Sequence, residues 1–366
     1  MESSSPSVPF PLLKDPARYT PCTIKYFDPA AGDDYTKPTK VSTMWIEVFR
    51  KSIPSFRARA AADSSVNDAE ERAEKFAQRY GEMLDDLDRN PLRHGGPFDC
   101  LMLCRLRDLV LRELGFEDIF KTVKGEENES ALKLLPSLLE EIDLINDGVQ
   151  RLERLIKGVF AGNIFDLGAA KTADLFEKGQ TNFKQVLGKL VPRPWVIDDL
   201  DRLKQRCASG PRYKKAVMFV DNAGADALLG MVPLAREFVK RGTKVVLAAN
   251  EVPSINDITC YELRDALSQI DDDDIVLALD SGSLCVVSSG SDLPVIDLLN
   301  VSPELAWAAD DADLVVLEGM GRAIETNLYA EFKCDSLCLG MVKHPEVAEF
   351  LGGTLYDCVC KFTEGH

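Results

Sequence analysis

Polar side chains follow several apolar runs in the second half of the chain, at points where buried strands would come to the surface. Asp221 and Asn222 follow the run AVMFV, and Asn250 follows VVLAA. An aspartate beside an asparagine offers oxygen atoms that a cation could use. Later runs show the same feature: Ser281 and Gly282 follow IVLALD, Glu318 and Gly319 follow LVVL, and Lys343 follows LCLGMV.

Strands of a parallel sheet are the elements that would bring these residues together. After Gly210, short apolar runs alternate with helical patterns. This alternation predicts an α/β fold, a three-layer α/β/α sandwich around a mostly parallel, doubly wound sheet. Because parallel strands end at one edge, where such sheets bind ligands, we expect the polar residues to converge there.

The chain is predicted to have three parts. Residues 1–40 are rich in proline and serine, which indicates an extended arm. Residues 41–210 form a mainly helical N-terminal domain, because segments such as 67–89 repeat apolar residues every three or four positions. Residues 211–366 form the doubly wound α/β domain that carries the site. The run DDDD at 271–274 is interpreted as a solvated loop before a strand.

Composition excludes several classes of partner. The 366 residues carry a net charge of −17, which repels nucleic acids and anionic membranes, so neither is expected as a partner. No apolar run approaches the roughly 18 residues of a membrane helix. The start of the chain lacks the features of a signal peptide, so a cytoplasmic protein is expected. The ten cysteines do not show zinc-ribbon spacing and are predicted to be buried free thiols.

Asp221, Asn222 and Asp257 are predicted to hold a divalent metal. Two carboxylates and an amide oxygen suit a hard cation such as Mg²⁺ or Mn²⁺. Asp257 falls in the loop after the second strand, or at the start of the next helix, near the same edge. The alternatives are a turn for Asp221 and Asn222 and a helix N-cap for Asp257.

Arg322 and Lys343 would add positive charge to the same edge. A phosphate facing a metal and two cations is an arrangement suited to phosphoryl transfer. Glycines, including Gly282 and Gly319, could let backbone N–H groups approach phosphate oxygens. Glu318 could orient a water, hold the phosphate network, accept a proton, or pair with Arg322. No P-loop motif follows the first strand, which excludes a P-loop kinase.

Asn163 and Asp166 form a polar pair in the otherwise apolar segment FAGNIFDLG. Spacing alone favours helix capping for this pair over a contribution to a site.

Taken together, FVDNAGAD, the AAN and ND residues at 248–257, SGS, EGMGR at 318–322 and the downstream MVK resemble the metal-dependent damage-control phosphatases. The resemblance covers most of the chain, including GNIFDLG. It implies that Asp221, Asn222 and Asp257 bind an ion, with Mn²⁺ expected and Ni²⁺, Co²⁺ or Mg²⁺ possible alternatives. It also implies that Asn163 and Asp166 belong to the substrate pocket. From their places at the expected strand ends, Asn250, Ser281, Gly282 and Gly319 are expected to be further phosphate contacts.

By resemblance, the expected reaction is hydrolysis of phosphomonoesters of small metabolites, such as 4'-phosphopantetheine and its oxidised forms. Glu318, Arg322 and Lys343 are the expected catalytic residues. Attack by water is preferred over an aspartyl-phosphate on Asp221, because haloacid-dehalogenase phosphatases that use the latter carry D-x-D and this chain has Ala223 at the third position. The alternatives are an S-adenosylmethionine-dependent methyltransferase, against which Asn250 at the second strand tip counts, and a non-catalytic metabolite-binding module.

Overall fold

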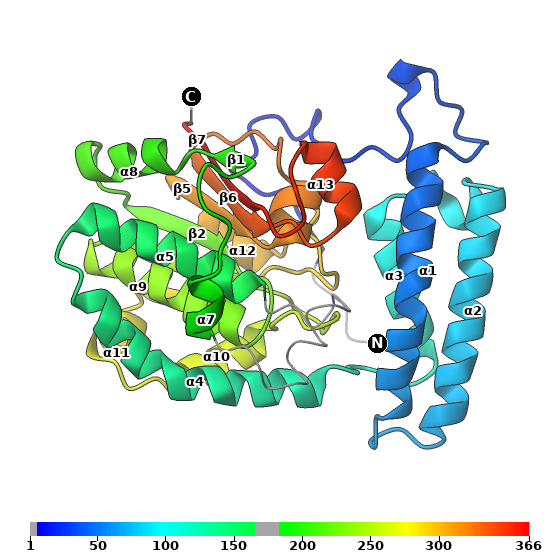
Figure 1. Cartoon of the computed structure of the whole chain (residues 1–366), viewed down its shortest axis with the longest axis horizontal. Coiled ribbons are helices and arrows are strands. Elements are labelled where there is room, and N and C mark those ends of the chain that lie inside the picture. Colours follow the sequence, from blue (N-terminus) through cyan, green and yellow to red (C-terminus); the bar gives the residue numbers. More distant parts are fainter. Residues whose placement is uncertain (1–5, 165–182, 366) are drawn as a thin grey trace. The chain divides into compact units, whose positions relative to one another are not determined.

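The computed structural model in Figure 1 describes residues 6–164 and 183–365. The chain divides into two compact units. One unit is Ile24–Thr122, and the other combines Met1–Thr23 with Val123–His366. These boundaries differ from the expected ones at residues 40 and 210, because the helices after residue 122 pack with the sheet.

The unit Ile24–Thr122 is helical. Its helix α2 (Ala69–Arg89) buries one apolar stripe that includes Phe76 and Tyr80 and leaves its charged residues outside. The Tyr80 hydroxyl donates a hydrogen bond of 2.9 Å to the carbonyl oxygen of Leu103 in a neighbouring helix. The other elements are η1 (Pro29–Ala31), α1 (Lys40–Ala61), η2 (Arg93–Gly95) and α3 (Cys100–Glu113).

The second unit is built on a seven-stranded sheet with the order β1-β7-β6-β5-β2-β3-β4. All neighbouring strands are parallel except β6 and β7, which are antiparallel. The predicted α/β class with a mostly parallel sheet is confirmed. The strands are β1 (Ile197–Asp198), β2 (Lys215–Phe219), β3 (Lys244–Ala249), β4 (Leu284–Ser288), β5 (Leu314–Glu318), β6 (Asp335–Met341) and β7 (Cys358–Thr363).

The winding of the sheet reverses between β2 and β5. From β2 the chain moves outward through β3 to β4, then returns to β5 on the opposite side of β2 and continues to β6. The two strands lie side by side, with Phe219 of β2 opposite Leu317 of β5. The carboxyl ends of such a neighbouring pair form the topological switch point, the usual ligand position in this class of sheet.

Helices cover one face of the sheet with a continuous apolar core. Side chains from α4 (Lys121–Asp143) and α5 (Gly148–Asn163) join this core together with alternate residues of the strands. Helices α8 (Leu200–Ser209), α9 (Val232–Lys240), α10 (Cys260–Ser268) and α11 (Asp273–Asp280) contribute to the same core. The remaining elements are α7 (Phe183–Leu187), η3 (Ala225–Met231), α12 (Pro303–Ala309), η4 (Met320–Thr326) and α13 (Pro345–Leu351).

Residues 6–23 run as an extended segment against the α/β unit. Val8 forms a β-bridge with Val301, and Leu13 forms one with Phe332. Between these two bridges, Phe10 is fully buried, and its ring packs edge-on against Phe219 of β2. The segment therefore contributes directly to the core behind the central strand.

The expectation that residues 275–280 form a strand is wrong, because they belong to helix α11. Asp272 is the N-cap of this helix and accepts a hydrogen bond from the N–H of Ile275, while the next two aspartates fill the first turn. The DDDD run is therefore mostly a helix start and not a loop before a strand. Ser281 and Gly282 consequently precede β4 and lie at the amino end of the sheet.

All ten cysteines are free thiols, as predicted, and six of them are buried. Among the helices of residues 6–164 and 183–365, none is both long and apolar enough to span a membrane.

Candidate functional site

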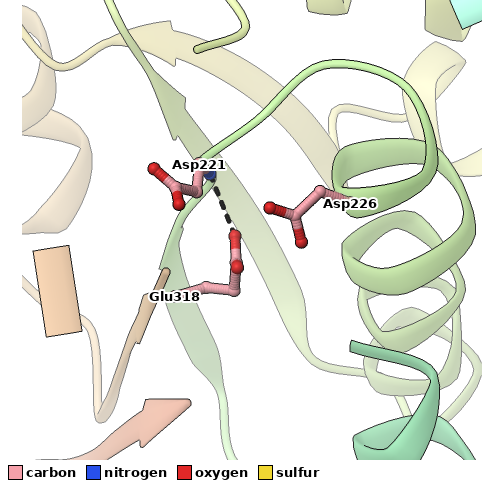
Figure 2. Close-up of side chains that lie close together, drawn as sticks. All are labelled: Asp221, Asp226 and Glu318. Atoms are coloured by element: carbon pink, nitrogen blue, oxygen red, sulfur yellow. Dashed lines mark hydrogen bonds between the residues drawn. The ribbon is translucent and has the colours of Figure 1, made fainter. Parts of the chain in front are cut away.

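Asp221 and Glu318 meet at the switch point between β2 and β5. Asp221 comes two residues after β2, and Glu318 is the last residue of β5. The backbone N–H of Asp221 donates a hydrogen bond of 2.9 Å to Oε2 of Glu318, drawn as a dashed line in Figure 2. Both side chains are buried. The predicted convergence of these two strand tips is thus present in the structure.

Asp226 completes a triad of acids that the sequence analysis did not identify. It lies in η3, the π-helix that follows the β2 loop, and Figure 2 shows its carboxylate facing those of Asp221 and Glu318. One carboxylate oxygen from each of the three residues lies within 4.8 Å of the others. Such a cluster of buried oxygen atoms could hold a metal ion.

Asn163, the last residue of α5, joins these acids. Its amide nitrogen donates hydrogen bonds to Asp226 (2.9 Å) and Glu318 (2.9 Å), and a longer one to Asp221 (3.4 Å). Its amide oxygen accepts a hydrogen bond of 3.1 Å from the backbone N–H of Met341 in β6. The structure therefore places Asn163 in the site, where it orients the acids. Its predicted partner, Asp166, lies outside the described residues.

Arg322 links the two carboxylates that were predicted to share an ion. It is fully buried in η4, the π-helix after β5, and its guanidinium forms ion pairs with Asp221 and Asp257. The nitrogen that contacts Asp257 also donates to Oδ1 of Asn250 at 2.9 Å. Asp257 and Asp221 therefore converge on one positive charge, and Arg322 is paired with them and not with Glu318.

Asn250 and Asp257 hold each other across the loop after β3. The Asn250 amide donates to Oδ2 of Asp257 at 3.2 Å and to the Leu293 carbonyl oxygen at 3.0 Å. Asn222 forms an isolated β-bridge with Asp257, so the loops after β2 and β3 are in register. The three predicted metal ligands are thus close together in the structure.

Gly319 lets the Asp221 carboxylate lie against the backbone, because glycine has no side chain. Its φ angle is +99°, and a Cβ atom built there would lie 2.1 Å from Oδ2 of Asp221. The expected phosphate contact through its N–H is not supported, since that N–H already bonds to the Leu339 carbonyl oxygen at 2.9 Å. The N–H of Gly282 is likewise bonded, to Leu279. Ser281 and Gly282 are at the opposite end of the sheet from Asp221, and the structure does not bring them into the site.

Lys343 lies two residues after β6 and is buried. Its backbone N–H contacts the sulfur of Met320 at 3.3 Å, which anchors it beside η4. Its positive charge acts to lower the pKa values of Asp221 and Asp226. Lys343 therefore contributes a second cation to the same buried volume.

Burial nevertheless makes the acids of the site difficult to ionise. Loss of water raises the pKa of Asp221 well above its ordinary value, against the opposing effect of Arg322. Burial also raises the pKa of Glu318, and the neighbouring charges of Asp226 and Asp221 raise it further. The pKa of Asp226 is raised for the same main reason. Removal from water therefore outweighs the attraction of the two cations.

The chemistry of this cluster fits a divalent cation. Asp221, Asp226, Asp257 and Glu318, if ionised, exceed Arg322 and Lys343 by two negative charges. Oδ1 of Asn222 and Oδ1 of Asp226 are buried and have no hydrogen-bond partner among the residues that the structure describes. A buried oxygen without a donor is costly, and a metal ion would satisfy it.

Comparison with known proteins identifies the family. Residues 48–359 match the model of the damage-control phosphatase ARMT1-like domain. The chain belongs to this family. The chain is also 57% identical to a damage-control phosphatase of Arabidopsis thaliana, over 100% of this chain and 99% of that protein. The family resemblance found in the motifs is confirmed.

Two longer relatives match the chain over part of their own length. Pantothenate kinase 2 of Arabidopsis thaliana is 41% identical over 96% of this chain, which spans 41% of the kinase. The 4'-phosphopantetheine phosphatase of Mus musculus is 34% identical over 98% of this chain, which spans 48% of the mouse protein. The chain thus matches one protein of its own length and parts of two longer proteins.

A solved structure supports the fold independently. The crystal structure of a DUF89 family protein from Pyrococcus horikoshii matches 88% of this chain and 98% of its own, with a TM-score of 0.60 and 19% sequence identity. At that identity the comparison supports the α/β architecture of the chain.

Proposed function

We propose that the chain is a metal-dependent phosphatase that hydrolyses phosphomonoesters of small metabolites. The observation that carries this proposal is the convergence of four buried acids with Arg322 and Lys343 at the switch point of the sheet. This arrangement matches the needs of a phosphate group held by a metal and two cations. Membership of a phosphatase family supports the same conclusion.

Asp221, Asn222 and Asp257 are the proposed metal ligands. Oδ1 of Asn222 is buried and has no partner within residues 6–164 and 183–365, and Asp221 and Asp257 already converge on one positive charge. The triad of Asp221, Asp226 and Glu318 is the competing ligand set, and Asp221 is common to both. A bound Mn²⁺, or Ni²⁺, Co²⁺ or Mg²⁺ in its place, would withdraw charge from a phosphate oxygen and lower the pKa of a water molecule.

The other residues would position the substrate and the attacking water. Lys343 would bind a phosphate oxygen, and Arg322 would neutralise charge while it fixes Asp221 and Asp257. Glu318 would accept a hydrogen bond from the water. A covalent step at Asp221 is disfavoured because one of its oxygens is paired with Arg322 and the other accepts hydrogen bonds from Asn163 and Asn222.

We propose 4'-phosphopantetheine and its oxidised forms as substrates. Support comes from the mouse relative, which is named a 4'-phosphopantetheine phosphatase, and from the pantothenate kinases that match the chain. Asn250 stands where a methyltransferase would present an acid, and its amide is occupied by Arg322 and Asp257. Asn250 therefore counts against the methyltransferase. A cytoplasmic location stays a prediction.

Phosphate release tests the proposal. The purified chain is assayed with p-nitrophenyl phosphate and with 4'-phosphopantetheine, in the presence of Mn²⁺, Ni²⁺, Co²⁺ or Mg²⁺ or of EDTA. We expect metal-dependent release, its loss in Asp221→Asn, and its retention in Asp310→Asn, which removes an exposed aspartate at the end of α12. If no metal supports release from any phosphomonoester, the enzyme proposal fails.

Metal affinity separates the two ligand sets. Asp257→Asn is compared with Asp226→Asn by calorimetric titration of Mn²⁺. The proposed set predicts that Asp257→Asn weakens binding more. The opposite order would assign the ion to Asp221, Asp226 and Glu318.

A further inference from the structure

The loop that carries Asp257 contains a strained residue. Ile255, two positions before Asp257, has a φ angle of +44°. Branching at Cβ makes this left-handed region unfavourable for isoleucine. Such a conformation persists only where surrounding contacts hold it. The contacts that hold this loop are therefore informative about the site.

Two backbone hydrogen bonds tie the loop to the tip of β2. The N–H of Ala223 donates a hydrogen bond of 2.9 Å to the carbonyl oxygen of Asn256. The N–H of Ile258 donates one of 3.0 Å to the carbonyl oxygen of Asp221. These bonds fix how the two loops lie along each other. They do not explain what supports the loop from its other side.

Lys124 supplies that support from helix α4. Its side chain is completely buried, and its Nζ forms an ion pair of 2.9 Å with Glu262. The same nitrogen donates a longer hydrogen bond of 3.4 Å to the carbonyl oxygen of Asp257. Glu262 in turn accepts a 2.9 Å hydrogen bond from the N–H of Thr259, the N-cap of α10. A fully buried lysine is rare and requires such pairing.

Asn128 lies one helical turn further along α4 and holds the other loop. Its Oδ1 accepts a hydrogen bond of 2.7 Å from the N–H of Gly224, between Asp221 and Asp226. A Cβ atom on Gly224 would lie 2.7 Å from Cβ of Glu127, so helix and loop are in close contact. Residues four apart share a helix face, so Lys124 and Asn128 brace both loops from one rigid element.

We propose that Lys124 and Asn128 are positioning residues that set the separation between the loop of Asp221 and the loop of Asp257. Helix α4 would thereby hold the two loops at the spacing that one metal ion requires. The metal readout rests on the proposed function, whereas the bracing of the loop does not. Supporting contacts of this kind change metal affinity by about 10- to 100-fold when they are removed.

The experiment compares Lys124→Met with Lys133→Met in the full chain. Lys133 lies on the same helix and pairs with Glu129 at 2.7 Å, but it is exposed. Hydrogen exchange is measured for backbone amides of residues 250–262 in metal-free protein, and Mn²⁺ affinity is measured by calorimetry. We expect faster exchange and about 10-fold weaker Mn²⁺ binding in Lys124→Met only. Equal exchange and equal affinity in the two variants would overturn the proposal.

A double variant separates positioning from the cost of a stranded charge. Lys124→Met leaves Glu262 without its buried partner, whereas Lys124→Met with Glu262→Gln removes both charges. We expect the double variant to recover thermal stability while Mn²⁺ binding stays weak. Full recovery of Mn²⁺ affinity would show that Lys124 acts only through charge, and the proposal would be wrong.

Asn128→Ala tests the contact between α4 and the loop of Asp221. It should disturb folding less, because it removes one hydrogen bond and no buried charge. We expect faster exchange at Gly224 and its neighbours, and a lower kcat at saturating Mn²⁺ with little change in KM. Unchanged exchange there would remove Asn128 from the proposal. If the wild-type chain bound no metal and released no phosphate, the proposed function would fail, and hydrogen exchange would still decide whether the brace exists.

Discussion

Two charged networks in the α/β unit shift the pKa values of their aspartates in opposite directions. On α9, Arg236 forms ion pairs of 2.9 Å with Asp143, Asp272 and Asp274. Hydrogen bonds from Arg236 lower the pKa of Asp143 to about 2. At the site, Asp221 is also paired with a buried arginine, yet its pKa is raised.

Exposure to water explains the difference. The Asp143 side chain is 38% exposed, and water solvates its ionised form. The Asp221 side chain is 7% exposed and lies among other buried acids. An arginine partner therefore stabilises a carboxylate at the rim of the protein but does not compensate for full burial beside like charges. If the acids of the site are ionised, the two cations do not balance their charge, and a divalent cation would.

The largest expected effect comes from removing one negative charge at the site. Asp221→Asn should lower kcat/KM for 4'-phosphopantetheine by at least about 100-fold, because it removes a metal ligand and a partner of Arg322. Steady-state phosphate release measures this loss. Asp143→Asn, the matched change in the other network, should keep full activity. If kcat/KM of the Asp221→Asn enzyme stayed within a few-fold of wild type, the contrast between the site and the Arg236 network would be wrong.

Arg236→Met should destabilise the chain by about 3 kcal/mol, because it removes the shared cation of three aspartates. Urea unfolding followed by circular dichroism measures the change. Arg18→Met, at an exposed position of the N-terminal segment, serves as the control. Activity of the remaining folded protein should be unchanged, since the network is separate from the site. A loss below 0.5 kcal/mol, about the size of a surface pair, would contradict a structural role for Arg236.

Metal should stabilise the folded chain, and more at pH 8 than at pH 5. The pKa values of Asp221 and Glu318 are raised on folding, so their ionisation costs stability as pH rises above their unfolded values of about 4. Mn²⁺ at 100 times its Kd should recover about 2.7 kcal/mol at the higher pH. Protons compete with the ion at the lower pH. Urea unfolding with Mn²⁺ or EDTA at both pH values tests this, and a pH-independent effect of metal would contradict it.

Asp143→Asn should have the smallest effect, at most about 1 kcal/mol at pH 7, because the pair is partly exposed. The pKa of Asp143 is lowered to about 2, so its contribution is complete above its unfolded value of about 4. It should fade as the pH falls through 2. Urea unfolding of the wild-type and Asp143→Asn chains at several pH values down to 2 measures the difference in stability. A difference that grows toward low pH would have the wrong sign.

Strand tips were the predictable part of the site. Asp221, Asn250, Glu318 and Lys343 follow apolar runs, and the parallel topology alone brings them to one edge. The run at 275–280 was wrongly predicted to be a strand, because a short, continuously apolar segment fits a helix as well as a strand. The signal that could have decided the matter was the preceding aspartate run, which supplies an N-cap and an acidic first turn.

Asp226 and Lys124 could not be assigned a role from their local patterns. Asp226 sits in the apolar segment ADALLGM, where a polar residue at a buried helix position was the available signal. Lys124 lies in the charged segment KGEENES, where a lysine normally faces solvent. Its burial results from α4 packing across two loops that are about a hundred residues later in the chain. Only the folded arrangement distinguishes it from Lys133.

The N-terminal segment has a practical consequence for anyone who shortens this protein for expression. Deletion up to residue 23 would look like trimming a proline-rich leader. It would remove Phe10, whose ring packs against Phe219, and expose the apolar side chain of Phe219 on β2, the strand that leads to Asp221. A shortened version should thus be less stable, because the strand that leads to Asp221 would lose a buried aromatic contact.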